Sequence, residues 1–543
     1  MINFDALTLK VFNEENHDFF SGAKIQKVQQ PGRSELIFYI RNKGQSRKFY
    51  INFNPIFYHL CFMSEKNEKK RNIKIPKSAP MFCMLLRKYI QNAVILDTRV
   101  PEAERIFEIY FDYYDELNEK ITLCLAVELM GKYSNVILYN YDTNVIIGCA
   151  HNVSSEKSRD RELAGLMPYI YPKKQNKKNL LNISESSFVN SIKNDEIVKS
   201  ISSKYNYLTM CNVEMFQKIV SFPYSHKKLY LILKDFLSSV KFQFYILNDF
   251  SKYFLFKTDN AFCVENINEM IDCYFAYHQN LYLKENLRQK IIKHINIQIK
   301  KLELLKSKQE EQIKKHDKAI EYKNKGDILI ANSYSIKNVV PQIILYDFDG
   351  NKLSIDLDIN LNVIENANRY YNLYKKTKSS FEYAQSMIED TKSQIMYYEE
   401  QKFFALNSCE YKDLKDIYNE FYPTEEKNTE KDINIENVEY KGYRIYIGKN
   451  KKQNDYILSK LSSGEDLWFH TLNSPGAHVL VKVKDKFNVS DEVLLKAAIL
   501  TKEYSSQKMN SKTSIIYTKR KYVKKATNKI AFVTYKNETE ILV

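Results

Sequence analysis

The chain has 543 residues, of which 44% are apolar and 27% are charged, and its mean hydropathy is −0.47. This length exceeds what one hydrophobic core supports and the composition excludes wholesale disorder, so the sequence predicts several globular domains. Lysine and arginine outnumber the acidic residues by 82 to 66, and the net charge of +16 favours polyanionic partners such as nucleic acid, although a lysine-rich genome would produce the same excess.

Eight cysteines are scattered without a CxxC pair, which favours reduced thiols in a cytosolic protein and argues against a structural zinc site. The first twenty residues lack the basic and apolar regions of a signal peptide. Uninterrupted apolar runs stay below the roughly 20 residues that span a bilayer. We therefore expect a cytoplasmic protein without membrane association, metal or cofactor.

Residues 1–175 alternate short strand-like runs with turns. The period-two pattern of β-branched and aromatic residues predicts a mixed sheet. The expected strands are 35–41, 48–53, 104–114, 121–129 and 135–140. One helix, 81–90, follows Pro80, a residue that is tolerated at a helix start. The sequence thus predicts a mixed α/β domain.

A helical pattern follows in residues 176–275, with helices expected near 194–204, 212–221 and 226–247. Two longer runs then carry heptad spacing. In the first, which lies between Leu281 and Tyr322, the seam is formed by Ile292, Ile299, Ile313 and Ile320, with Ile295 and Leu302 as partners, and Lys306, Gln309 and His316 interrupt it. In the second, about 364–405, the seam is formed by Tyr374, Phe381, Ile388 and Ile395, with Thr377, Ala384, Thr391 and Tyr398 as partners.

These two runs predict a long antiparallel coiled-coil hairpin, with 326–338, 342–348 and 352–358 as a small cap at its tip. An arm that spans a large partner and a plain dimerisation coil both fit the pattern. The charged stretch 426–440 is predicted to be a linker. Residues 441–543 are predicted to be a compact α/β module, with strands at 443–448, 466–471, 477–483, 514–518 and 530–535 and a helix at 491–504 behind Ser490. The fold class is therefore α+β and multidomain.

Catalytic signatures are lacking: the sequence has no P-loop, dinucleotide fingerprint, HExxH or GxSxG motif. The polar residues that stand out lie in strongly apolar surroundings, namely Arg87, Glu104, Arg105 and Glu128. Each fits an ordinary salt bridge or a hydrogen-bonded core group. Because arginine is scarce in this lysine-rich chain, a bidentate contact of Arg105 with a phosphate or a base edge is the functional alternative.

Near the C-terminus a basic segment runs without an intervening acid, and Tyr517 and Tyr522 lie within it. Its basic residues are Lys508, Lys512, Lys519, Arg520, Lys521, Lys524, Lys525 and Lys529. RNA-backbone binding and a merely solvated basic face fit it equally well. The loop 466–482 holds the only tryptophan together with His470 and His478, which are either ligands or structural residues.

Several ordered blocks resemble the NFACT family over nearly the full length. They include NFDALTL (3–9), PMFCMLLRKYI (80–90), ELMGKYSNVIL (128–138), GDILIANSY (326–334) and DLWFHTLNSPGAHVLV (466–481). The resemblance implies an NFACT-N domain at 1–175 and a helix-hairpin-helix-like domain at 176–275. It further implies a coiled-coil hairpin with a middle segment at 276–425, the linker at 426–440, and an NFACT-R RNA-binding domain at 441–543.

Within the family, the chain resembles the RqcH-type ribosome quality control factors. That resemblance implies binding to large ribosomal subunits blocked by peptidyl-tRNA, recruitment of alanyl-tRNA and untemplated alanine addition to the nascent chain. The ribosome would transfer the peptide, so no enzymatic activity is expected. The implied partners are the large subunit, rRNA, tRNA and a small S4-type RNA-binding protein such as RqcP.

The resemblance also carries residue roles. It implies tRNA binding by Asp5, Glu104, Arg105, Glu128, Leu129 and Met130, and the basic segment adds rRNA binding by Lys519, Arg520, Lys521, Lys524 and Lys525. Two departures stand out. Glu104 replaces a family aspartate, and the stretch 203–215 lacks the glycine that relatives carry in their hairpin, which makes a tight turn harder to form.

Two rival functions remain at this stage. A fibronectin-binding surface adhesin would need an unexplained export route. A DNA glycosylase is suggested by a distant similarity of the first two domains to formamidopyrimidine glycosylases, but those enzymes use an N-terminal proline, whereas this chain begins Met-Ile.

Overall fold

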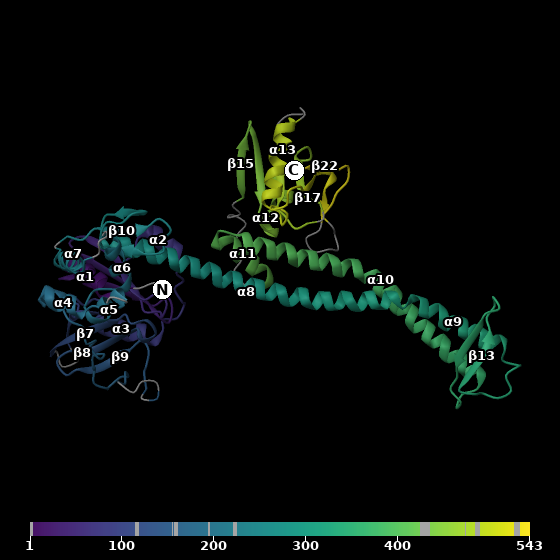
Figure 1. Ribbon diagram of the computed structural model, residues 1–543, viewed down its shortest axis with the longest axis horizontal. Coiled ribbons are helices and arrows are strands. Elements are labelled where there is room, and N and C mark those ends of the chain that lie inside the picture. Colours follow the sequence, from purple (N-terminus) through teal and green to yellow (C-terminus); the bar gives the residue numbers. More distant parts are fainter. Residues whose placement is uncertain are drawn as a thin grey trace. The chain divides into compact units, whose positions relative to one another are not determined.

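The computed structural model describes residues 4–114, 119–154, 156, 161–193, 196–220, 225–239, 241–423, 435–472, 474–483, 489–525 and 533–543. Internal contacts divide the chain into two units, residues 1–282 and 283–543, each of which is considered by itself (Figure 1).

Two antiparallel sheets, one of four strands and one of five, form the core of the first unit, and each follows chain order. Their strands are β1 (Lys24–Gln29), β2 (Glu35–Asn42), β3 (Gln45–Asn52) and β4 (His59–Phe62), then β5 (Ile95–Arg99), β6 (Ile106–Tyr114), β7 (Lys120–Glu128), β8 (Asn135–Asn140) and β9 (Val145–Cys149). The five predicted strands are confirmed as β2, β3, β6, β7 and β8, but the predicted mixed sheet is wrong. Tight turns such as Lys43–Gly44, where both residues have positive φ, join neighbouring strands and allow only antiparallel pairing.

Three α-helices accompany these sheets in the described part of residues 1–175, not the single helix expected. They are α1 (Ala6–Phe20), α2 (Glu65–Arg71) and α3 (Met81–Ile90), and α3 has the predicted bounds. The sequence did not reveal α1 because its buried residues lie on several faces and leave no clear helical period. Its Phe20 ring lies 5.1 Å from that of Phe49 and 5.2 Å from that of Phe62, inside an aromatic core.

Residues 176–266 contain short helices followed by a small sheet. The elements are α4 (Glu185–Ser191), α5 (Ile197–Lys204), α6 (Met210–Ile219) and α7 (His226–Ser238), then β10 (Phe244–Leu247), β11 (Tyr253–Phe254) and β12 (Ala261–Val264). The helix predicted to reach 247 therefore ends at Ser238, because Ser239 adopts extended backbone and aromatic, β-favouring residues follow. The glycine-free hairpin closes with Tyr207 in the left-handed region, at φ 63°.

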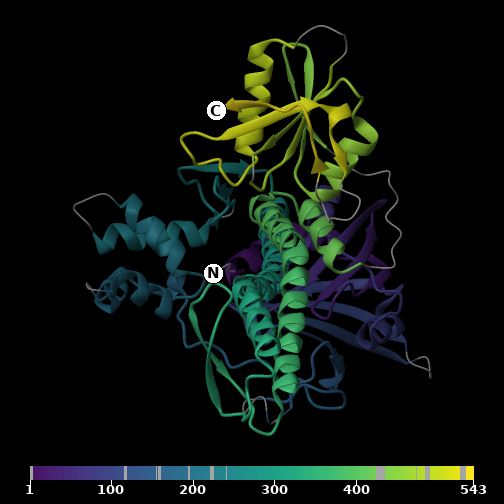
Figure 2. The same ribbon diagram turned by 90° about the vertical axis from the view of Figure 1, so that its right-hand side faces the viewer.

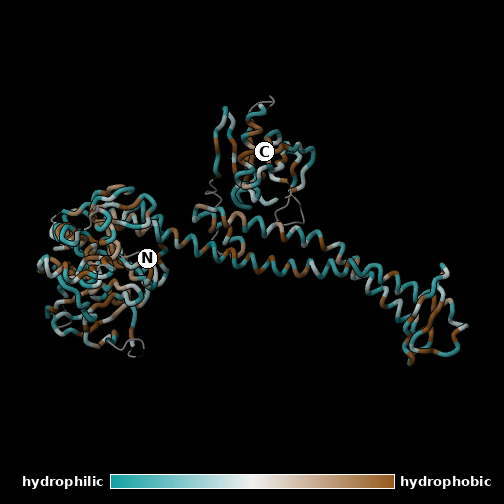
Figure 3. The backbone as a smooth tube through the Cα atoms, viewed as in Figure 1, coloured by the Kyte–Doolittle hydropathy of each residue, from teal (hydrophilic) through white to brown (hydrophobic). Residues whose placement is uncertain are grey.

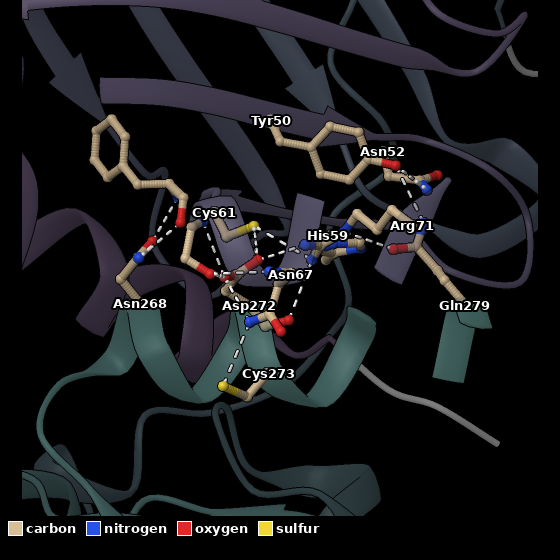
Figure 4. A network of polar contacts seen from close by, with 12 residues as sticks. Tyr50, Asn52, His59, Cys61, Asn67, Arg71, Asn268, Asp272, Cys273 and Gln279 are labelled. Atoms are coloured by element: carbon tan, nitrogen blue, oxygen red, sulfur yellow. Dashed lines mark hydrogen bonds and ion pairs between the residues drawn. The ribbon is translucent and has the colours of Figure 1, made fainter. Parts of the chain in front are cut away.

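A buried polar network fastens the first turns of α8 (Ile267–Lys314) to β3, β4 and α2 (Figure 4). The side chains of Arg71 and Asp272, 1% and 2% exposed, form an ion pair with 2.5 Å between Nη1 and Oδ1. Asn67 Nδ2 donates to Asp272 Oδ2 at 2.8 Å, and Arg71 Nε donates to Gln279 Oε1 at 2.9 Å. Gln279 Nε2 in turn donates to the hydroxyl of Tyr50 at 3.1 Å. The pair is thus hydrogen-bonded on both sides, as a buried ion pair must be to offset its desolvation.

Beyond residue 283, α8 continues into a helical hairpin with α9 (His316–Ala331) and α10 (Val363–Asn407) (Figure 1). The pairing is antiparallel: Arg288 bonds to the carbonyl of Ala405, and Tyr371 donates to Asp327 at 2.7 Å. At about 1.5 Å per residue, the 48-residue α8 is roughly 70 Å long. The predicted tip strands are confirmed as β13 (Gln342–Tyr346) and β14 (Lys352–Asp356), but 326–331 belongs to α9 and not to the cap.

Burial along α10 agrees with the predicted heptad seam. In the first arm, formed by α8 and α9, the buried positions are displaced from the predicted seam. Along α10, Ala384 and Thr391 are buried and the other predicted seam residues are half-buried. Hydrophilic colours dominate much of the backbone trace of this hairpin, interrupted by hydrophobic positions (Figure 3). In the first arm Ile295 is buried, but Ile320 is 48% exposed and Ala319 takes its place. The reason is the break between α8 and α9 at Lys315, which changes the rotation of the helix. Gln309 is buried despite its polar side chain, as is Gln401 of α10.

The C-terminal module is a six-stranded antiparallel sheet in the order β15-β16-β18-β17-β19-β22, and α13 (Asp491–Glu503) packs against it (Figure 2). The strands are β15 (Glu436–Tyr440), β16 (Tyr443–Gly448), β17 (Leu467–Thr471), β18 (His478–Val481), β19 (Ser514–Lys519) and β22 (Thr539–Leu542). The remaining elements are α11 (Tyr411–Phe421), α12 (Lys451–Tyr456), β20 (Lys524–Lys525) and β21 (Val533–Thr534), with two short non-α helices at Ile457–Leu461 and Arg520–Tyr522. The predicted linker is wrong at 436–440, which is a strand because each of these five residues pairs with a residue of β16; residues 424–434 lie outside the described ranges.

Candidate RNA-binding pocket

The register of β6 and β7 brings together two segments that contain residues predicted to bind tRNA. These strands pair with Ile106 opposite Glu128, so the residues just before β6 lie beside those just after β7. Leu129 N donates to the carbonyl of Arg105 at 2.8 Å. Glu104 and Arg105 therefore meet Met130 at one end of the sheet.

Asp5 joins this group from the start of α1. It is the N-cap residue of that helix, and its carboxylate accepts a hydrogen bond from Thr8 N at 2.8 Å. A pocket of about 280 Å³ lies between Asp5, Glu104, Arg105 and Met130. The remaining lining residues are Phe4, Ala6, Ala103, Pro172, Lys173, Gln175, Lys177 and residues 206–209. Four of the six residues predicted to bind tRNA thus share one pocket.

Cations and acids line the pocket together. Arg105, Lys173 and Lys177 face Asp5 and Glu104, so the lining carries three cations and two carboxyl groups. Burial raises the pKa of Glu104, while Lys174 and Arg105 act in the opposite direction. Burial likewise raises the pKa of Asp5, opposed by the hydrogen bonds from Thr8 and by Arg105. Such a mixture can contact both a phosphate and the polar edge of a base.

Arg105 keeps donors available for a ligand. Its Nη1 donates to the hydroxyl of Tyr58 at 3.4 Å, and the guanidinium lies 5.7 Å from the centre of that ring. Within the described ranges, no other guanidinium nitrogen of Arg105 donates a hydrogen bond to the protein. A guanidinium has five N–H donors in a planar fork, which suits bidentate contact with a phosphate or a base.

The pocket wall contains two non-glycine residues in the left-handed region. Ala103 and Tyr207 have φ values of 61° and 63°, and Ala103 N donates to the Tyr207 hydroxyl at 2.8 Å. Left-handed backbone is costly for an aromatic residue and persists where the surroundings enforce it. The glycine-free hairpin is therefore formed at a cost in backbone strain, and its tyrosine becomes part of the pocket.

The other two predicted tRNA-binding residues lie elsewhere. Glu128 is fully buried and accepts hydrogen bonds from Arg161 Nη1 at 2.7 Å and from the Tyr169 hydroxyl at 3.0 Å. Leu129 is fully buried in the apolar core. Neither lines the pocket, and both are buried where β7 ends. Sequence reasoning did not single out Lys173, Lys177 or Tyr207, although the run PKKQNKK (172–178) was a visible basic signal.

The basic C-terminal segment is an uninterrupted basic run in the sequence but not in the structure. Lys519 and Lys521 both pair with Glu465, at 2.8 and 2.7 Å, so an acid distant in the sequence lies between them in space. Arg520 points inward: Nη2 donates to the Leu458 carbonyl at 2.6 Å and Nη1 to the Val523 carbonyl at 2.7 Å. Lys524 is exposed on β20. The side chain of Lys525 and the whole of Lys529 lie outside the described residues.

Across the described ranges, no helix is long and apolar enough to cross a membrane. A polar pocket with mixed charge, a long helical arm and a sheet module with a lysine-rich edge together are typical of a multidomain RNA-binding protein. Comparison with known proteins places the chain within this class. The family model of the NFACT N-terminal and middle domains matches residues 5–434, and that of the NFACT protein RNA binding domain matches residues 435–534. The chain belongs to the NFACT family.

Relatives align with the whole chain or with part of it. The Rqc2 homolog RqcH of Bacillus subtilis is 26% identical over 582 residues, which cover 100% of this chain and 98% of the relative. Coiled-coil domain-containing protein 25 of Mus musculus is 35% identical over 91 residues, 16% of this chain and 43% of that protein. The solved N-terminal part of the fibronectin/fibrinogen-binding protein from Streptococcus suis is 24% identical, covers 50% of this chain and 99% of its own, and superposes with a TM-score of 0.43.

Proposed function

We propose that the protein is a ribosome-associated quality control factor that binds stalled large ribosomal subunits carrying peptidyl-tRNA. It recruits alanyl-tRNA to them and directs untemplated addition of alanine to the C-terminus of the nascent chain. Family membership and the full-length similarity to RqcH proteins support this proposal. The single observation that carries it is the pocket in which Asp5, Glu104 and Arg105 meet.

The pocket suggests how a tRNA is held. The planar guanidinium of Arg105 contacts a phosphate or a base edge through paired N–H donors. The carboxylate of Glu104 accepts a hydrogen bond from an exocyclic amino group of a base, and this contact reads sequence while the cations fix the backbone. Lys173 and Lys177 add attraction for phosphate at the rim of the same pocket.

The protein itself catalyses no step in this proposal, since the ribosome transfers the peptide. Its partners are the large subunit, rRNA, tRNA and a small S4-type RNA-binding protein such as RqcP, and it works in the cytoplasm. Contact with rRNA falls to the C-terminal module, in which Lys519, Lys521 and Lys524 are exposed. Because Arg520 is turned inward, these lysines supply the phosphate contacts.

Paired alanine substitutions test the pocket. The double variant Glu104→Ala, Arg105→Ala should lose tRNA from the affinity-purified protein, as measured by sequencing the bound RNA, while large subunits still co-purify. The matched control is Arg99→Ala, which removes an arginine with 61% side-chain exposure from neighbouring β5 and should leave tRNA recovery unchanged.

Unchanged tRNA recovery in the double variant would reject the pocket as the tRNA site. Failure of the wild-type protein to co-sediment with large subunits at low salt would reject the proposed function itself. A thermal melt of each variant separates loss of binding from loss of folding.

A further inference from the structure

The loop with the only tryptophan forms an aromatic cluster in the C-terminal module. Trp468 and His470 on β17 stack with their ring centres 5.7 Å apart and an interplanar angle of 6°. His478 on β18 meets Trp468 edge-on at 5.3 Å and His470 at 5.2 Å. The ring of Tyr535 lies 5.8 Å from that of Trp468. The two histidines that the sequence singled out therefore belong to one cluster with the tryptophan.

A pocket of about 240 Å³ opens beside this cluster, within the unit of residues 283–543. His470 and His478 line one side with Tyr535, and Tyr397 and Glu400 of α10 line the other. None of the described lining residues is a lysine or an arginine. This volume lies below the roughly 300–1,000 Å³ of pockets for drug-sized ligands and leaves room for one small ring system.

Two titratable groups of this pocket, His470 and Glu400, are neutral at pH 7. Burial lowers the pKa of His470 to about 4, although the backbone of Gly476 and Thr471 acts in the opposite direction, so the imidazole is uncharged. Burial and then repulsion by Glu420 raise the pKa of Glu400 to about 8, opposed by Lys451, so this carboxyl keeps its proton. A neutral imidazole and a protonated carboxyl each offer a donor and an acceptor without charge.

Hydrogen-bonding capacity is left unused here. Within the described residues, Nε2 of His470, which lines the pocket, is buried and has no hydrogen-bond partner in the protein. Nε1 of Trp468, behind the pocket lining, also lacks a partner. Such atoms are rare in folded proteins because leaving them unpaired costs free energy, and a ligand in the pocket is one way to pair His470 Nε2. The ligand that fits is planar, uncharged and able to donate and accept hydrogen bonds along its edge.

We propose that this pocket binds one unstacked RNA base, held between the aromatic rings and hydrogen-bonded by His470 and Glu400. Single-stranded RNA is recognised in this way, by stacking splayed bases on aromatic or histidine rings and reading their edges. Lys451 lies outside the pocket, with its ammonium 5.1 Å from the centre of the Tyr397 ring and 2.7 Å from Glu420, and is placed to meet the RNA backbone. The inference rests on the proposed RNA-binding function and deepens it with a base-binding site in the C-terminal module.

Trp468 provides a direct readout because it is the only tryptophan of the chain. The full-length protein is titrated with a mixed-sequence single-stranded hexaribonucleotide and with an abasic hexamer that has the same ribose-phosphate backbone. A base-binding pocket predicts a saturable change in tryptophan emission with the first oligomer and at least tenfold weaker binding of the second. Equal responses to both oligomers, or a response to neither, would overturn the proposal.

Substitutions at Glu400 sharpen the test, because this residue lies on α10 outside the core of the module. Glu400→Leu should weaken the fluorescence-detected affinity at least fivefold. Glu400→Gln keeps a neutral donor and acceptor and should bind within twofold of the wild type. The matched control is Glu399→Leu, at an exposed neighbouring position, which should change nothing. Equal affinities for all three variants would contradict the assigned contact.

The pH dependence separates Glu400 from the other titratable groups around it, which are Tyr397, Glu420, Lys451, His470 and His478. Wild-type affinity should fall as pH rises through about 8, because the carboxyl then loses the proton it donates. Glu400→Gln should abolish that fall.

The failure of this inference and the failure of the proposed function can be told apart. If the N-terminal pocket passes its own test while Trp468 does not respond, only this inference fails. If Trp468 responds but the double variant Glu104→Ala, Arg105→Ala retains tRNA, only the N-terminal assignment fails.

Discussion

In the N-terminal pocket, residues that are distant in the sequence lie close together, whereas in the basic C-terminal segment neighbouring residues point in different directions. Asp5 and Arg105 are a hundred positions apart, yet they share one pocket. Lys519, Arg520 and Lys521 are consecutive, yet the lysines pair with Glu465 and the arginine turns into the module. Residues that are adjacent in the sequence therefore need not share a surface, whereas side chains from separate elements can converge in one pocket.

The largest effect expected from this contrast is one of stability. Arg520→Ala should lower the free energy of unfolding by about 3 kcal/mol, because hydrogen bonds from a charged group to the carbonyls of Leu458 and Val523 are lost. RNA affinity should stay within twofold once the protein is folded. Urea unfolding and RNA filter binding measure the two quantities, and a large loss of affinity in a fully stable variant would restore Arg520 as an RNA contact.

A smaller effect is expected from a conservative change in the N-terminal pocket. Arg105→Lys keeps the charge but removes the planar fork, so tRNA affinity should fall about tenfold, or about 1.4 kcal/mol. Competition binding with purified tRNA gives this ratio. Full retention of affinity by the lysine variant would show that Arg105 acts only as a positive charge and does not read geometry.

The smallest effect concerns Glu465. Hydrogen bonds from Lys519 and Lys521 lower the pKa of its carboxyl to about 2, so both pairs persist as pH falls until the carboxyl is protonated near that value. Glu465→Ala should free both lysines and raise RNA affinity two- to threefold, with a steeper dependence on salt, because more counterions are released on binding. Titrations at two salt concentrations check this, and reduced affinity would mean that Glu465 orders the lysines for RNA.

Much of the fold follows from local pattern. Helix α3 and strand β8 have the predicted bounds, since their apolar residues keep a clear helical or alternating period. Helix α1 and the sheet of β10, β11 and β12 were not predicted, because burial on several faces and aromatic-rich short runs obscure the period. The register break at Lys315 is likewise a tertiary feature that heptad counting does not detect.

Some residues of the candidate site could be predicted from the sequence and others could not, for physical reasons. Adjacent antiparallel strands make the meeting of Arg105 with Met130 a consequence of chain order. The position of Asp5 in the pocket depends on how α1 packs. Asp5 was predicted only from the family resemblance. Tyr207 could not be identified, because nothing in its neighbours announces a left-handed tyrosine whose hydroxyl bonds to Ala103.

The glutamines buried in the helical hairpin limit how its two arms can slide. Gln309 and Gln401 are 6% and 0% exposed, and among the described residues Gln309 Oε1 and both amide atoms of Gln401 have no hydrogen-bond partner. A buried polar side chain in a coiled coil lowers stability, and such residues are a known device for fixing one alignment of the helices. A single alignment of the two arms would fix the distance along the helices between the base of the hairpin and its tip.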